Sequence, residues 1–101
     1  MSTRSKGRKN ELRARNILVT AGYDVQMAPN PTRFAKQTDL FSLWDLMAIR
    51  KTDIRFVQVK TNQKRKETWE PMELWECPSN CSKEVWVFHD RVKEPSIYLL
   101  K

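Results

Sequence analysis

Two runs of hydrophobic, β-branched and aromatic residues near the middle of the chain predict a β-hairpin. The first run covers residues 43–50 and the second covers residues 54–62. Residues 50–53 are polar, and a short polar break between two apolar runs is typical of a hairpin turn. The two runs are therefore expected to lie side by side as neighbouring strands of one sheet.

Three polar residues interrupt these apolar runs and indicate a shared site. Asp45 lies in the first run, and Gln58 and Lys60 lie in the second. Side chains alternate between the faces of a strand, so Gln58 and Lys60 share one face, while Val57 and Val59 point to the other. A carboxylate or an ammonium group in an apolar strand costs free energy unless a partner offsets it. Their presence on adjacent strands predicts that they serve one site.

The segments around the hairpin complete a predicted α-β-β-β-α-β-β order. A helical pattern of apolar residues ends at Gly22, a residue suited to the position just past a helix end. Pro71 fits the first turn of a second, short helix. The other expected strands span residues 23–28, 84–89 and 96–100. We therefore expect one α/β domain over residues 1–101 with a mixed central sheet, in which residues 1–5 form a flexible basic arm.

Composition predicts a globular intracellular protein. Hydrophobic residues make up 40% of the chain and charged residues 31%, proportions that a disordered chain does not have. No apolar run approaches the length of a membrane span. Residues 1–9 are polar and basic and lack the apolar core of a signal peptide. The expected location is the cytoplasm or nucleoid of a prokaryotic or viral host.

The net charge of +7 indicates a polyanionic partner, most often nucleic acid for a basic domain of this size. The alternative is that the excess charge only keeps the protein soluble. The loop over residues 32–42 interleaves basic residues with Phe34 and Phe41, a pattern suited to phosphates and bases. Equally, the two rings could pin the loop to the body. The residues expected to contact DNA are Arg4, Lys6, Arg8, Lys9, Arg33 and Lys36.

The cysteines and the histidine do not predict a zinc site. Cys77 and Cys81 are the two cysteines, and His89 is the one histidine. A structural zinc site needs four ligands, and no convincing fourth ligand is present. Two unreactive thiols are the expected state, because a disulfide would require an oxidising compartment or extreme heat.

The polar residues of the hairpin, together with an acid of the first helix, are suited to a hydrolytic metal site. Mg²⁺ and Mn²⁺ prefer hard oxygen ligands. Asp45 offers a carboxylate, Gln58 an amide oxygen, and Glu11 a second carboxylate that acts directly or through water. Lys60 could orient a water molecule or stabilise charge on a phosphate. The alternatives are a solvated strand face and, for Glu11, an ordinary surface ion pair.

The spacing of Asp45 and Gln58-Val59-Lys60 resembles the PD-(D/E)xK nuclease motif, in which an Asp is followed on the next strand by Glu or Gln, any residue and Lys. The N-terminal part of the chain also resembles a family. Residues 6–11 and the helix that follows them, with its Gly-Tyr-Asp-Val exit at residues 22–25, are similar to the opening of the archaeal-type Holliday junction resolvases. The resemblance covers about residues 6–62.

This resemblance implies a PD-(D/E)xK fold and a homodimer that cuts four-way DNA junctions with Mg²⁺ or Mn²⁺. It implies that Glu11 is the helical acid, Asp45 the central metal ligand and Lys60 the catalytic lysine. Thr32 is the nearest match to a loop hydroxyl of the family. Gln58 stands where the family usually has Glu, which removes one negative charge and should weaken metal affinity.

The sequence departs from the family pattern in two further ways. The loop between Met27 and Asp45 is longer than is usual in the family. Met27 stands where the family often has a basic residue that contacts a phosphate, so Arg33 or Lys36 is expected to make this phosphate contact instead.

Two other functions are possible for such a site. Nucleases of the Mrr restriction group carry Gln-x-Lys, and a duplex endonuclease of this kind is one alternative. The other is a DNA-binding module that has lost catalysis through Gln58.

Overall fold

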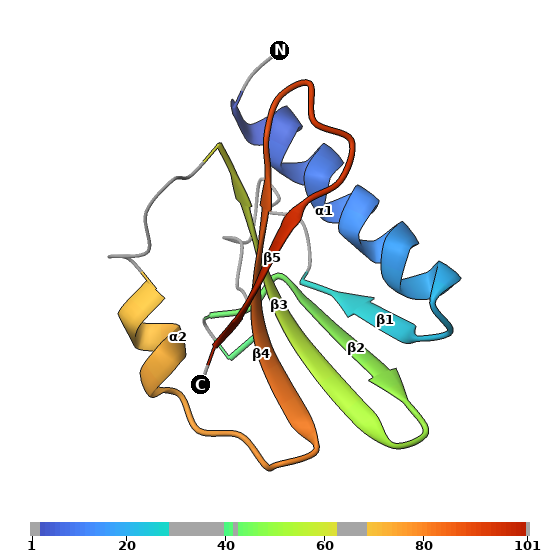
Figure 1. The fold of residues 1–101 in the computed structure, drawn as a ribbon, viewed down its shortest axis with the longest axis vertical. Coiled ribbons are helices and arrows are strands. Elements are labelled where there is room, and N and C mark those ends of the chain that lie inside the picture. The colour runs from blue at the N-terminus through green and yellow to red at the C-terminus, as the bar shows by residue number, and fades with distance from the viewer. Residues whose placement is uncertain (1–2, 29–39, 42, 63–68, 101) are drawn as a thin grey trace, which may run out of the picture.

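The computed structural model describes residues 3–28, 40–41, 43–62 and 69–100, with side chains from Gly7 onward. The elements follow the predicted α-β-β-β-α-β-β order (Figure 1). They are α1 (Thr3–Thr20), β1 (Asp24–Met27), β2 (Leu46–Arg50), β3 (Asp53–Thr61), α2 (Glu70–Leu74), β4 (Cys81–Phe88) and β5 (Ser96–Leu100). Within these residues, no helix combines the length and apolar character needed to cross a membrane.

The five strands form one mixed sheet in the order β1-β2-β3-β4-β5. Three neighbouring pairs are antiparallel, and β3 and β4 are parallel. A parallel pair needs a crossover connection, because the chain must return to the same end of the sheet. The segment that contains α2 makes this crossover. The predicted mixed α/β sheet is confirmed.

Each face of the sheet carries its own hydrophobic cluster. On the α1 face, Leu18 of the helix packs with Val57 of β3 and Trp86 of β4. On the α2 face, Met72 of the helix packs with Phe56 and Val85. The two helices thus cover opposite sides of the sheet (Figure 1). Because Val57 belongs to the α1 face, Gln58 and Lys60 belong to the α2 face.

The ends of several elements differ from the prediction, and β4, for example, begins at Cys81 and not at residue 84. β2 begins at Leu46, so Asp45 precedes the strand and does not lie within it. Trp44 is excluded from the ladder because its backbone exchanges two hydrogen bonds with Leu40. Helix α1 begins at Thr3, so residues 3–5, which we expected in a flexible arm, are helical.

A buried ion pair, which the sequence analysis did not predict, joins β3 to β4. The Arg55 guanidinium donates to both carboxylate oxygens of Glu84, at 2.8 and 2.6 Å. Ser82 Oγ and Trp86 Nε1 also donate to this carboxylate. Burial opposes ionisation of Glu84, but these hydrogen bonds and the Arg55 charge outweigh it and hold the pKa of Glu84 below its ordinary value.

Candidate active site

Asp45 lies at the point where β1 ends and β2 begins, and its backbone is fixed to both neighbouring strands. Its amide donates to the Val57 carbonyl at 2.9 Å, and its carbonyl accepts from the Ala28 amide at 2.8 Å. The residue is 5% exposed. Asp45 is therefore held at the junction of three strands, with little freedom to move.

The Asp45 carboxylate reaches across to the backbone of β3. Its Oδ2 accepts a hydrogen bond from the Val59 amide at 2.8 Å. The Asp45 side chain thus supplies the acceptor for the Val59 amide just beyond the end of the β2–β3 pairing, where a backbone carbonyl would otherwise accept. Since Val59 lies between Gln58 and Lys60, this bond brings the carboxylate to the part of β3 that the sequence predicted as its partner.

Gln58 contributes a buried oxygen that no donor among the described residues satisfies. Its Oε1 is inaccessible to solvent and makes no hydrogen bond with any residue that the structure describes. A buried acceptor without a partner costs about 1–3 kcal/mol. Either a donor or a cation would remove this cost, so the Gln58 amide is a chemically suitable cation ligand.

Lys60 lies one step further along the same face of β3 and is half-buried. Within the described part of the chain, its ammonium group takes part in no hydrogen bond or ion pair. A half-buried lysine of this kind keeps its donors available for an anion such as a phosphate oxygen. Gln58 and Lys60 therefore present an acceptor and a cation on one face, as predicted.

Glu11 approaches the same region from the opposite face, on α1. Its carboxylate pairs with Arg8 at 3.3 Å, and its side chain is 13% exposed. The same Arg8 nitrogen lies 3.5 Å from the Ala28 carbonyl, and the Ala28 amide donates to Asp45. This chain of contacts places Glu11 near the Asp45 end of the sheet. Among described residues, no hydrogen bond joins Glu11 to Gln58 or Lys60.

The remaining predicted site residues divide into two groups. Arg8 and Lys9 lie on α1, where Lys9 is exposed. Arg4 and Lys6 belong to the first two turns of α1, and their side chains lie outside the described atoms. Thr32, Arg33 and Lys36 lie outside the described residues, so their roles stay predictions.

Two polar residues that the sequence analysis missed attach α1 to the sheet, Asn10 at the end of β3 and Arg13 at the connection between β4 and β5. Asn10 is 5% exposed, and its Nδ2 donates to Thr61 Oγ1 at 2.9 Å. Arg13 donates to Asn10 Oδ1 at 3.1 Å and to the Lys93 carbonyl at 2.7 Å. Their spacing of three residues on one helix face was the one available signal. These bonds fix α1, and with it Glu11, against the strand that carries Gln58 and Lys60.

The donor set allows a metal ion but does not enclose one. The described residues contain no group of three or more His, Cys, Asp or Glu side chains placed to hold a metal. The residues that could hold a divalent cation are Asp45 and Gln58, with Glu11 as a further carboxylate. One carboxylate and one unsatisfied amide oxygen are hard ligands suited to Mg²⁺ or Mn²⁺.

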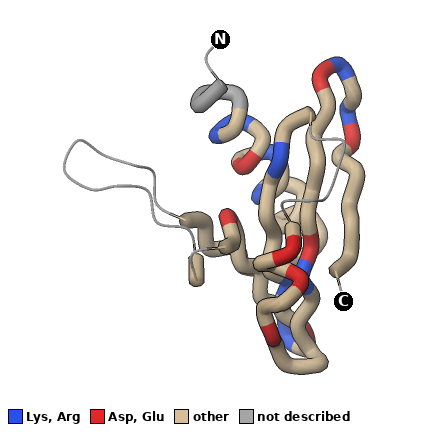
Figure 2. The backbone as a smooth tube through the Cα atoms, turned by 90° about the vertical axis from the view of Figure 1, so that its left-hand side faces the viewer, with Lys and Arg blue, Asp and Glu red and all other residues tan. Residues whose placement is uncertain are grey.

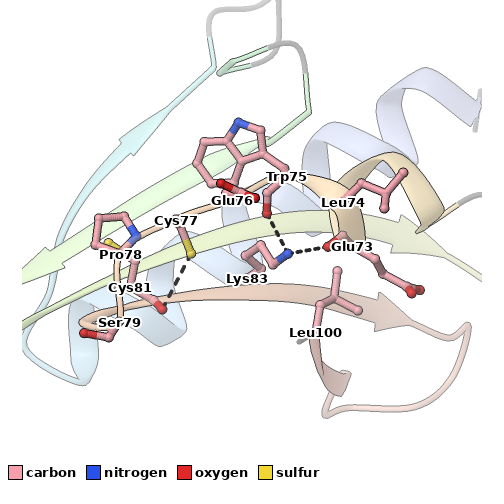
Figure 3. A pocket seen from close by; sticks show the side chains of 10 residues that line it. All are labelled: Glu73, Leu74, Trp75, Glu76, Cys77, Pro78, Ser79, Cys81, Lys83 and Leu100. Atoms are coloured by element: carbon pink, nitrogen blue, oxygen red, sulfur yellow. Dashed lines mark hydrogen bonds between the residues drawn. The ribbon is translucent and has the colours of Figure 1, made fainter.

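A pocket of about 550 Å³ lies elsewhere, between the end of α2 and the start of β4 (Figure 3). Lys83 of its lining donates to the carbonyls of Glu73 and Trp75, both at 2.7 Å, and so satisfies acceptors at the end of a helix. Cys77 and Cys81 also line the pocket as free thiols, and burial together with Cys77 raises the pKa of Cys81. No predicted site residue lines this pocket, and we assign it no function.

No protein-family model matches the chain, and no curated protein matches it significantly.

Proposed function

We propose that this protein is a metal-dependent DNA endonuclease of the PD-(D/E)xK kind that cuts four-way junctions as a homodimer. The observation that carries the proposal is the hydrogen bond from Val59 to the Asp45 carboxylate. It joins the acid and the Gln-x-Lys segment, which lie on separate elements, at one position of the sheet. The element order and the mixed sheet also agree with what the resemblance implies.

The roles of the residues follow from their chemistry. Asp45 and Gln58 would hold the divalent cation, which would supply charge stabilisation and an activated water when bound. Lys60 would stabilise the negative charge that develops on the phosphate, since a preorganised cation is most effective in a site with little water. Glu11 would orient the cation or its water from the α1 side. Lys9 would bind the phosphate backbone beside the site.

The twofold symmetry of a homodimer matches the symmetry of a four-way junction. The junction has two strands to cut, which are related by a near-twofold axis, and a symmetric dimer presents two identical sites in the same relation. Selectivity would then rest on branch geometry and phosphate contacts more than on base reading.

A second candidate function is DNA binding without catalysis. It is favoured by the absence, among described residues, of three or more acidic, cysteine or histidine side chains around one metal position. Gln58 in place of Glu also reduces the negative charge available to a cation. The position of Lys60 on the same strand face as the unsatisfied Gln58 oxygen favours the nuclease, because a binding module has no need of a cation ligand beside a lysine.

One assay separates these functions. The wild-type protein is incubated with a four-way junction, a linear duplex and a single strand, each with Mg²⁺, with Mn²⁺ or with EDTA, and the products are resolved on a gel. Junction cleavage that requires metal supports the resolvase, and cleavage of the linear duplex supports a restriction-type enzyme. Binding without cleavage under any of the metal conditions supports the binding module. Failure to bind DNA at all would overturn the nucleic-acid assignment.

A further inference from the structure

The edge strand β5 presents an exposed surface without charge. Ile97 and Tyr98 are each 45% exposed, and Leu99 is 72% exposed. The strand Ser96–Leu100 contains neither a charged residue nor a proline. Figure 2 shows it along one edge of the molecule with no charged residue coloured on it. Natural edge strands usually carry charge or proline or are covered, since a bare edge pairs with other strands.

The exposed side chains lie beyond the reach of α1. Ile97 pairs with Trp86 and Leu99 pairs with Glu84, so both point to the α1 face of the sheet. The helix packs mainly on β1, β2 and β3 and leaves the β5 side of this face open. On the other face, the centroid of the Tyr98 ring lies 5.2 Å from the centroid of the Trp69 ring. Part of the Tyr98 side chain is therefore packed against a buried residue. The open strip is therefore formed by Ile97 and Leu99.

We infer that β5 pairs edge to edge with β5 of a second copy of this chain, antiparallel and about a twofold axis. An edge strand offers a row of backbone donors and acceptors, which only another strand satisfies in sequence. A twofold axis makes the contact self-complementary. In a pairing centred on Tyr98, Ile97 of one copy lies opposite Leu99 of the other, and two apolar strips merge on one face.

Charge identifies the occupant as a second copy and not as nucleic acid. Each chain carries a net charge of +7, so two copies repel each other unless they meet at an uncharged surface. β5 is such a surface. A polyanion, by contrast, finds no cation on this strand to neutralise its phosphates. The inference rests on β5 alone and does not depend on the candidate active site.

The test is the oligomeric state of the full chain, measured by light scattering after size exclusion and by sedimentation velocity. The wild-type protein is expected to be a dimer. Leu99→Lys should raise the dimer dissociation constant by about a hundredfold or more, because it places a lysine from each copy at the seam. Val19→Lys is the control, since Val19 is also an exposed apolar residue, at 52%, and lies near the end of α1, which packs mainly on β1, β2 and β3. It should leave the dimer intact.

A second measurement covers the case in which Leu99→Lys does not fold, as judged by circular dichroism. Amide hydrogen exchange of the wild-type protein at low and high concentration should show added protection in residues 96–100 as the dimer forms. A monomeric wild-type protein, equal effects of the two lysine variants, or no added protection in β5 would each overturn the inference. A dimer that cuts junctions but gains no protection in β5 would refute the β5 contact alone, whereas a dimer protected in β5 that neither binds nor cuts DNA would refute the proposed function alone.

Discussion

Arg55 of β3 and Glu84 of β4 form a two-point ion pair across the parallel seam of the sheet, with the carboxylate 1% exposed and the guanidinium side chain 23% exposed. The Arg55 guanidinium also lies over the Tyr23 and Trp86 rings. Breaking a buried pair leaves one charge uncompensated. Glu84→Ala is therefore expected to lower the free energy of unfolding by about 3–5 kcal/mol, measured by urea denaturation. The double change Arg55→Met and Glu84→Leu should recover most of this loss, and equal losses in the single and double variants would contradict the assignment.

The same carboxylate predicts how stability depends on pH. The folded state lowers the pKa of Glu84, so the folded protein holds fewer protons than the unfolded chain in mildly acidic solution. The contribution of Glu84 to the free energy of unfolding is complete at pH values above the ordinary pKa of a glutamate, 4.5. This contribution is lost as the pH falls through the lowered pKa of the folded state. Unfolding free energies of the wild-type protein measured between pH 7 and pH 3 should fall. The Arg55→Met and Glu84→Leu variant should lose less over that interval, and an identical decline would contradict this cause.

Two substitutions at Asp45 should separate its structural role from its chemical role. Asn keeps an oxygen that can accept from the Val59 amide, whereas Ala removes it. Asp45→Asn is expected to abolish cleavage with little loss of stability and of junction binding, since binding rests on phosphate contacts. Asp45→Ala should also lower the free energy of unfolding by about 1–2 kcal/mol. Cleavage by Asp45→Asn at the wild-type rate would show that the site is elsewhere.

Gln58 and Lys60 should respond differently to metal concentration. A carboxylate is a stronger ligand for hard cations than an amide, so Gln58→Glu should lower the Mg²⁺ concentration for half-maximal cleavage. Gln58→Ala should raise it, with a smaller effect at saturating metal. Lys60→Ala should reduce the rate even at saturating metal, because its expected role is charge stabilisation in the transition state. If both Gln58 variants needed the same Mg²⁺ concentration for half-maximal cleavage as the wild-type protein, Gln58 would only fill the strand face.

Salt dependence should locate the DNA surface. Lys9 is exposed on α1 near the candidate site, and Lys51 is exposed in the turn at the opposite end of β3. The affinity for a four-way junction should fall linearly in a plot of log affinity against log salt. Lys9→Ala should reduce that slope by about 1, whereas the control Lys51→Ala should leave it unchanged. A wild-type affinity that does not change with salt would remove the basis for a nucleic-acid partner.

The sequence by itself determined the elements and their faces, because these depend on local periodicity. Alternation along residues 54–62 placed Gln58 and Lys60 on one face, and the structure assigns Val57 and Val59 to the cluster on the other face. The element order and the hairpin turn also follow from short-range signals. The bounds of β2 did not follow, since Trp44 is held by Leu40 through a bridge that no local pattern reveals.

Only the tertiary structure decided which distant groups meet. The Arg55–Glu84 pair depends on the parallel register of β3 and β4, which the crossover through α2 sets. The bond between Asp45 and Val59 depends on where β2 starts, and the position of Glu11 depends on how Asn10 and Arg13 attach α1 to the sheet. Contacts across many intervening residues are fixed by packing and register, and the periodicity of one segment carries no information about them.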